Sequence, residues 1–165
     1  MPTKDLAVAN WFISRGIVEN KPLTQMQLHK LVYFAHMLSL TTLNKPLAGD
    51  EFEAWEYGPV LNELYSHTKS WGKSPITSVI HHARAPMDVI IPEVSDSALN
   101  AILEATWNGY AQFTAIQLSN LSHELNGPWD MAFKTQVRFA KISDEQIKQF
   151  YAPRVNEYLK QKMIA

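Results

Sequence analysis

Gln27-Leu28-His29-Lys30-Leu31-Val32-Tyr33-Phe34-Ala35 is the stretch of this sequence that decides the fold. Wound as a helix, it is apolar nearly all round, and such a helix is normally buried at the centre of a domain. Thr24 is a good N-cap residue, and Gln27, three residues later, completes a capping box. The sequence therefore predicts a central helix that begins after Thr24.

The same start signal occurs twice more, at Thr114 with Gln117 and at Ser143 with Gln146. These boxes predict helices over about 114–124 and about 143–163, the second kinked or divided at Pro153. Apolar spacing predicts two further helices, over residues 5–15 and about 96–110. We therefore expect a mainly α, single compact helical domain.

A short region departs from this helical pattern. Between Leu43 and Tyr57, turn-forming residues are followed by residues that alternate with a period of two. We expect a small antiparallel β-element around residues 47–57, formed as a hairpin with Pro46-Leu47. Gly58-Pro59 would then begin a helix with proline in its first turn. A second strand is expected at 87–91.

Composition excludes several functional classes. The chain has 165 residues, a net charge of −1 and no cysteine. It therefore has no global attraction to nucleic acid or anionic lipid, and it can form neither disulfides nor thiolate metal sites. No apolar run approaches the length of a membrane span, and the N-terminus lacks a signal-peptide pattern. We expect a cytoplasmic protein with no membrane partner.

The residues that could carry catalysis fail a test of spacing. Six histidines are present, but none has the carboxylate or second histidine that a metal-binding helix requires. Ser119, Ser122, His123 and Glu124 have the residue types of a catalytic triad, but neighbours on one short helix cannot adopt its geometry. We predict no enzymatic activity, no metal and no cofactor.

Lys30 stands out because it is a cation within an apolar run. Leaving an ammonium buried and unpaired would cost several kcal/mol. It could extend to water, pair with Glu53 or Glu56, or bond to backbone carbonyls near Gly58. A charge centre that orients a partner surface is the functional interpretation of the same residue.

Charge is uneven along the chain. Residues 46–68 contain five acidic residues and no lysine or arginine, whereas residues 130–165 contain seven basic residues against four acidic ones. An acidic surface could meet a basic partner, flanked by an exposed histidine stripe. The candidate partner-binding residues are His29, His36, Asp50, Glu51 and Glu63. The basic C-terminal third, which includes residues 130–165, instead favours an alternative function, a phage or plasmid DNA-binding regulator.

The sequence resembles the Panacea domain, the SocA-like antitoxin family found in prophage-associated proteins. The resemblance rests on segments 23–35, 52–60 and 118–129. The matching residues, which we interpret as mainly structural, are Lys30, Tyr33, Phe34, Trp55, Tyr57, Gly58, Pro59, His123, Pro128 and Trp129.

The resemblance implies an antitoxin whose partner is a cognate toxin encoded by a neighbouring gene. Some members resemble proteolytic adaptors that deliver their toxin to a AAA+ protease, and others resemble direct neutralisers. It also implies a domain over residues 1–150, followed by a helical extension over 151–165. Nucleic acid is not an expected partner of the domain itself.

Overall fold

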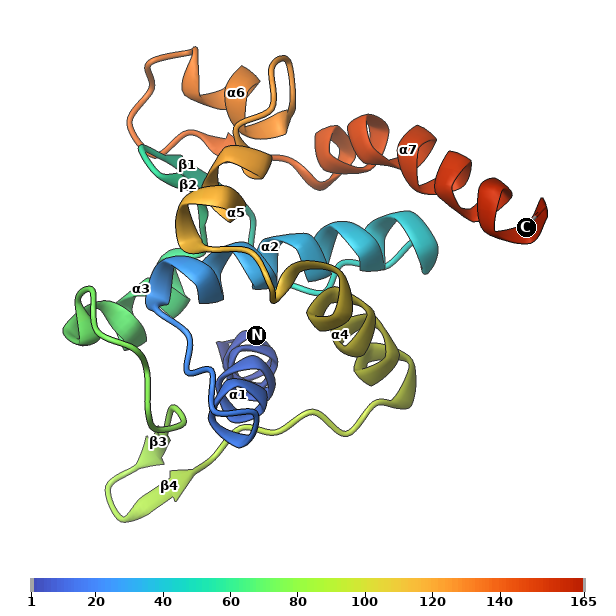
Figure 1. Cartoon of the computed structure of the whole chain (residues 1–165). Coiled ribbons are helices and arrows are strands. Elements are labelled where there is room, and N and C mark those ends of the chain that lie inside the picture. The colour runs from blue at the N-terminus through green and yellow to red at the C-terminus, as the bar shows by residue number, and fades with distance from the viewer. Residues whose placement is uncertain (1, 165) are drawn as a thin grey trace.

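α2 (Gln25–Thr42) runs through the middle of the molecule, and the other elements pack around it (Figure 1). The computed structural model describes residues 2–164, with side chains described from residue 4 to residue 158. The other helices are α1 (Pro2–Val18), α3 (Asn62–Thr68), α4 (Ser97–Tyr110), α5 (Ala115–Ser122), α6 (Pro128–Phe133) and α7 (Asp144–Ile164). The strands are β1 (Phe52–Trp55), β2 (Gly58–Val60), β3 (His82–Ala85), β4 (Asp88–Ile90) and β5 (Lys141–Ile142), and a 3₁₀ turn, η1, covers Lys69–Trp71.

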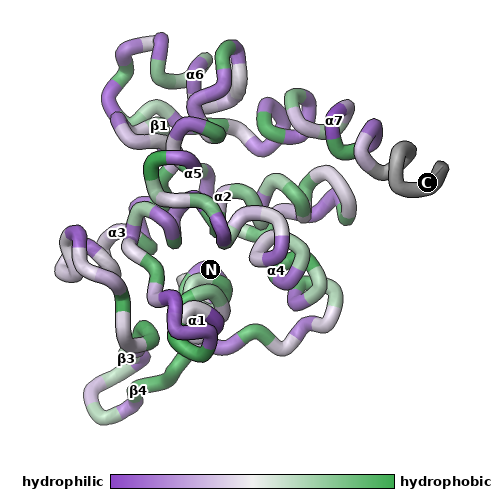
Figure 2. Tube along the Cα trace, in the orientation of Figure 1, coloured by the Kyte–Doolittle hydropathy of each residue, from purple (hydrophilic) through white to green (hydrophobic). Residues whose placement is uncertain are grey.

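Burial of α2 organises the core. The helix contacts α1, α3, α4, α5, α7 and β2, and its stretch from Leu28 to Met37 is buried without a break. Apolar residues recur along α2 and along its neighbours α1 and α4 (Figure 2). The predicted central helix and the mainly α fold are both confirmed.

The three predicted capping boxes are present. Thr24 Oγ1 accepts a bond from the Gln27 backbone at 3.3 Å, and the Gln27 side chain accepts one from the Thr24 backbone at 3.0 Å. The pairs Thr114 with Gln117 and Ser143 with Gln146 make the same two bonds. Each box satisfies backbone N–H groups that a helix start leaves unpaired, so α2, α5 and α7 begin where the sequence predicts.

The small sheet has the order β2-β1-β5, and both pairings are antiparallel. Trp55 pairs with Gly58 across a two-residue turn, and Phe52 pairs with Ile142. The predicted pairing with Pro46-Leu47 is therefore wrong, since residues 43–51 form no strand. The predicted helix start at Gly58-Pro59 is also wrong, because these residues form β2 and α3 begins at Asn62.

Residues 82–165 include three elements that the sequence did not predict, β3, α6 and β5. The strand expected at 87–91 is present as β4, which pairs with β3. α7 is one helix with Pro153 inside it, so the proline does not divide it. The predicted boundary between residues 1–150 and 151–165 falls inside this helix, next to Tyr151, which is 7% exposed.

Candidate functional site

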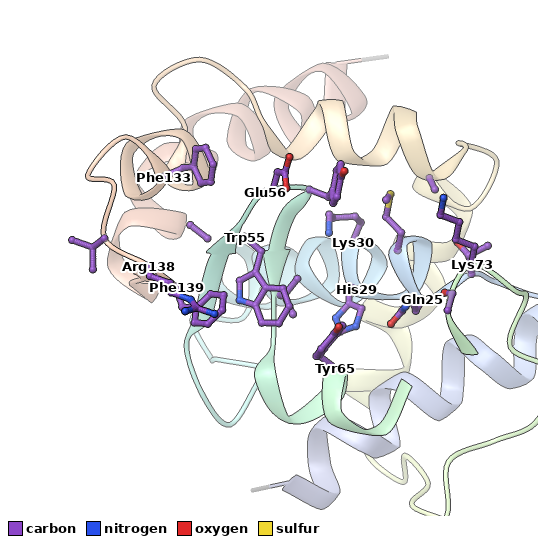
Figure 3. Close-up of a pocket in the computed structure, with 18 of the residues that line it drawn as sticks. Gln25, His29, Lys30, Trp55, Glu56, Tyr65, Lys73, Phe133, Arg138 and Phe139 are labelled. Carbon is purple, nitrogen blue, oxygen red and sulfur yellow. Dashed lines mark hydrogen bonds between the residues drawn. The ribbon is translucent and has the colours of Figure 1, made fainter. Parts of the chain in front are cut away.

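A groove of about 920 Å³ opens beside the first half of α2 (Figure 3). We call it the aromatic groove. Its apolar wall consists of Met26, Ala54, Trp55, Tyr57, Val60, Tyr65, Ala115, Phe133, Val137 and Phe139. Its charged or polar lining residues include Thr24, Gln25, His29, Lys30, Glu56, Lys73, Gln136 and Arg138. Five separate parts of the chain, around residues 24–30, 54–65, 72–73, 115 and 133–139, thus meet around one hollow.

Ring contacts hold the apolar wall in place: Trp55 packs edge-to-face against Tyr65 and stacks on Phe139. The Trp55 ring lies 4.7 Å from that of Tyr65 and 4.9 Å from that of Phe139, between centroids. The Arg138 guanidinium lies 4.8 Å from the centroid of Phe139. These contacts link β1, α3 and the segment after α6, and they leave ring faces and edges available to a ligand.

Lys30 lies in the floor of the groove, between His29 and Glu56 as viewed in Figure 3. Its side chain is 1% exposed, and its Nζ donates to the Pro59 carbonyl at 3.3 Å. Burial lowers the pKa of its ammonium from 10.5 to about 7, because a charge is poorly solvated there. Of the predicted alternatives, the bond to a backbone carbonyl near Gly58 is confirmed.

The alternative pairing of Lys30 with a carboxylate is wrong. Among the described residues no acidic side chain lies within ion-pair distance of Lys30. Glu53 instead accepts a bond from Trp55 Nε1 at 2.7 Å and faces Lys141 Nζ at 3.4 Å. The carboxylate of Glu53 is therefore paired with Trp55 and Lys141. The hydrogen-bond acceptor of Lys30 is the neutral Pro59 carbonyl oxygen.

Gly58 covers the end of the lysine. A Cβ at this position would lie 2.4 Å from Lys30 Cε and 2.8 Å from Ser122 Oγ. The φ of Gly58 is +119°, which side chains rarely adopt. Glycine is therefore required both by the turn into β2 and by the close approach of the lysine stem.

The motif residues of α5 and α6 hold the β1–β2 turn, which lies next to Lys30, in place. The His123 and Trp129 rings stack with centroids 3.7 Å apart, and Trp129 Nε1 donates to the Trp55 carbonyl at 2.7 Å. Ser119 Oγ donates to the Tyr57 carbonyl at 2.9 Å. The β1–β2 turn is thus fixed to α5 and α6, with Pro128 in the first turn of α6.

His29 is buried beside Lys30, with 3% exposure. Its Nε2 lies 3.3 Å from Thr68 Oγ1, and its Nδ1 has no hydrogen-bond partner. Burial, reinforced by the charge of Lys30, lowers its pKa to about 3. His29 is therefore a neutral ring at physiological pH, and the prediction that it lies on an exposed stripe is wrong.

His36 is also buried, so the second half of that predicted stripe is wrong too. Its Nδ1 accepts bonds from the Leu47 and Ala48 backbones at 3.2 and 3.0 Å. Its Nε2 must then carry the proton, which it donates to Asp144 at 2.7 Å. His36 ties α2 to the turn before β1 and to the start of α7, a structural role.

The acidic candidate residues lie at the surface, outside the aromatic groove. Asp50 and Glu51 are exposed in the turn before β1, and Glu63 is exposed in the first turn of α3. Lys141 lies 4.0 Å from Asp50, and His67 lies 3.3 Å from Glu63. Their role in binding a partner stays a prediction.

Tyr33 and Phe34 belong to the core. Tyr33 packs edge-to-face against Phe52 and Tyr151, and Phe34 stacks on Tyr110 with centroids 4.4 Å apart.

The sequence patterns did not predict much of the groove wall. The residues missed are Tyr65, Lys73, Phe133, Val137, Arg138 and Phe139. Several of these lie in an irregular segment, where no periodic pattern marks a shared face.

The described part of the chain was compared with the requirements of a metal site and of a membrane span. No three His, Asp or Glu side chains there gather closely enough to hold a metal ion. None of the helices described has the length and apolar character needed to cross a membrane.

Comparison with known proteins identifies the family. The family described as antitoxin SocA-like, Panacea domain, matches residues 28–130, which run from the buried part of α2 to α6. The chain belongs to this family. The expected resemblance is thereby confirmed, and all ten residues of the predicted Panacea motif lie within the matched range.

A curated relative points the same way. Antitoxin SocA of Caulobacter vibrioides (strain NA1000 / CB15N) is 29% identical over 127 residues, covering 76% of this chain and 68% of that protein. No solved structure matches this chain. Membership of the Panacea family supports an antitoxin role.

Proposed function

We propose that this protein is an antitoxin that neutralises a cognate toxin by binding it directly, with the aromatic groove as the principal contact. Family membership supports the antitoxin part of the proposal. The observation that favours the groove is its exposed apolar wall. Tyr57 is 61% exposed, Val137 64%, Phe133 43% and Phe139 40%.

Such a wall suits a protein partner. Clustered exposed apolar side chains often mark interaction sites. Aromatic and arginine side chains are also the residue types most enriched where binding energy concentrates, and the groove presents both. Trp55 and Tyr65 are partly buried behind the rim, so an inserted side chain would lose its contact with water, as binding hot spots require.

The acidic surface formed by Asp50, Glu51 and Glu63 is a second candidate contact. Its exposure favours it, and a toxin that acts on RNA or nucleotides would have a basic active site to meet it. His29 and His36 cannot flank it as surface residues, because both are buried. We therefore place this surface second to the aromatic groove.

Growth rescue separates the two surfaces. The protein and the product of the neighbouring gene are co-expressed, and colony formation is scored. We expect Tyr57→Ala combined with Val137→Asp to abolish rescue and to weaken binding by at least ~2 kcal/mol, roughly thirtyfold. The control is Met87→Asp, which changes a still more exposed apolar residue at the tip of the β3–β4 turn, outside the groove.

The reverse pattern would identify the other surface. If Asp50→Lys, Glu51→Lys and Glu63→Lys together abolished rescue and the groove variant did not, the acidic surface would be the contact. Absence of rescue by the unaltered protein would reject the antitoxin assignment for that pair. Toxin abundance in the same cells tests the adaptor mode, because delivery to a AAA+ protease lowers the toxin level and direct neutralisation does not.

The DNA-binding alternative has weaker support. Several cations of the basic C-terminal third already face carboxylates: Lys134 with Asp130, Lys141 with Glu53, and Arg154 with Glu124. Cations paired in this way are less available to phosphates. A DNA affinity that falls steeply with salt would nevertheless favour the regulator.

A further inference from the structure

We infer that the aromatic groove binds a segment of the toxin that carries a carboxylate among apolar side chains, and that this carboxylate pairs with Lys30. The inference rests on the proposed function, because it names the chemistry that the groove would recognise. The juxtaposition behind it is a buried ammonium without an anion at the floor of an apolar, open hollow.

The charges that line the groove favour an acidic ligand. Lys30, Lys73 and Arg138 are basic, and only Glu56 is acidic. Neither Lys73 nor Arg138 forms an ion pair with any side chain between residues 4 and 158. A carboxylate that enters the groove would therefore meet a net positive charge in partly water-excluded surroundings, where the attraction is stronger than in bulk water.

Lys30 is the strongest of these three attractions. Its ammonium has three protons to donate, and the structure gives it a single neutral acceptor, at a long 3.3 Å. Its charge is buried at the expense of the folded state. A carboxylate that reached it would supply both the missing acceptor and the missing charge, which makes the contact favourable and selective.

The walls define the rest of the ligand. Trp55 packs edge-to-face against Tyr65 and stacks on Phe139, and the three rings form an aromatic surface that suits an aromatic or aliphatic side chain. The volume of about 920 Å³ is near the upper end of ligand pockets, which admits several side chains of a peptide. A nucleic acid backbone fits less well, because it would need a row of cations where the wall is apolar.

Binding of this kind should take up a proton. In the free protein at pH 8, Lys30 is mostly neutral because its pKa lies at about 7. A neighbouring carboxylate favours the charged form. The other titratable groups that face Lys30 are His29 on α2, His123 on α5 and Glu56 in the β1–β2 turn. Burial lowers the pKa of both histidines, so they stay neutral at pH 8.

Calorimetry with the product of the neighbouring gene tests the inference. An inactivated form of this toxin is titrated into the antitoxin at pH 8 in Tris and in HEPES, whose heats of ionisation differ. We expect net proton uptake with the unaltered protein. Lys30→Met should bind at least tenfold more weakly and lose that uptake, whereas Lys21→Met, at an exposed lysine outside the groove, should change neither.

A second pair of variants protects the test against misfolding. Lys73→Glu with Arg138→Glu alters only exposed side chains and should also weaken binding. On the toxin, replacing one acidic residue by its amide should reproduce the effect of Lys30→Met, and combining both changes should add little further loss.

The outcomes distinguish the inference from the proposed function. If the toxin bound and Lys30→Met changed neither affinity nor proton uptake, the inference would be overturned and the antitoxin function would stand. Competition by a DNA oligonucleotide, or self-association of the antitoxin through Val137, would also overturn it. Failure of the unaltered protein both to bind the toxin and to rescue growth would reject the function itself.

Discussion

Lys30 and Gly58 depend on each other. The lysine stem lies directly against the glycine backbone, and the ammonium donates to the carbonyl of the next residue, Pro59. The turn into β2 gains a hydrogen bond and a packed stem, while the fold bears the cost of a buried cation. Stability alone would be better served by an apolar side chain, so this lysine is the residue most plainly suited to a ligand.

Replacing Lys30 by methionine should therefore stabilise the protein near pH 7, because Met keeps the packing of the stem without the charge. The lysine pKa is lowered from 10.5 to about 7 on folding, so the unfolded chain binds more protons between those values. Stability of the unaltered protein should rise from pH 7 to pH 9.5, and that of the variant should rise less. Urea unfolding across this range measures both slopes, and parallel curves would contradict a lowered lysine pKa.

Gly58→Ala should destabilise the protein by roughly 2 kcal/mol or more, since it adds both backbone strain at positive φ and a contact with Lys30. Gly109→Ala is the matched control. Gly109 lies near the end of α4 with nothing within 4 Å of its added Cβ, so the change should stabilise by about 0.5–1 kcal/mol. Chemical denaturation measures the change in unfolding free energy for both variants. Equal changes would mean that Lys30 leaves room for a side chain at position 58.

At the scale of elements, local signals gave correct predictions and long-range pairings did not. The capping boxes at Thr24, Thr114 and Ser143 are completed within four residues, so α2, α5 and α7 could be located from the sequence. Gly58-Pro59 is locally a good helix start, but pairing with β1 makes it a strand. β5 pairs with residues almost 90 positions earlier, and nothing in its two residues indicates that.

The central position of α2 predicts a large effect of truncating its core side chains. Leu31 is 0% exposed, and Leu31→Ala should cost on the order of 2–5 kcal/mol, because it removes buried contacts and leaves a cavity. Thr42→Ala, at the exposed end of the same helix, should change stability by less than about 0.5 kcal/mol. Thermal unfolding tests the pair, and a melting temperature of Leu31→Ala equal to that of the unaltered protein would contradict a central role for α2.

At the scale of the molecule, the groove combines segments that are far apart in the chain. Lys30, Trp55 and Tyr57 belong to motifs that the sequence singled out, but Phe133 to Phe139 reach the groove only through the folding of α6 and β5. The histidine stripe failed for a related reason. Helical spacing placed His29 and His36 on one side of α2, but it could not predict that α3, α7 and the turn before β1 cover that side.

The extent of the folded domain gives the last prediction. The sequence places its end at residue 150, but Tyr151 is 7% exposed and packs edge-to-face on Tyr33, with centroids 6.4 Å apart. A chain that ends at Phe150 loses this ring and should lose about 2–5 kcal/mol of stability. A chain that ends at Tyr158 keeps every α7 side chain that the structure describes as buried, and should unfold at the same urea concentration as the unaltered protein.

The midpoints of urea unfolding compare the two truncated chains with the unaltered protein. Tyr151→Ala in the full chain is the control that separates loss of the ring from loss of the helix end. Because domains of this size have roughly 5–15 kcal/mol of stability, the shorter chain should still fold at low temperature and retain growth rescue there. Equal midpoints for both truncations would instead place the end of the domain at residue 150.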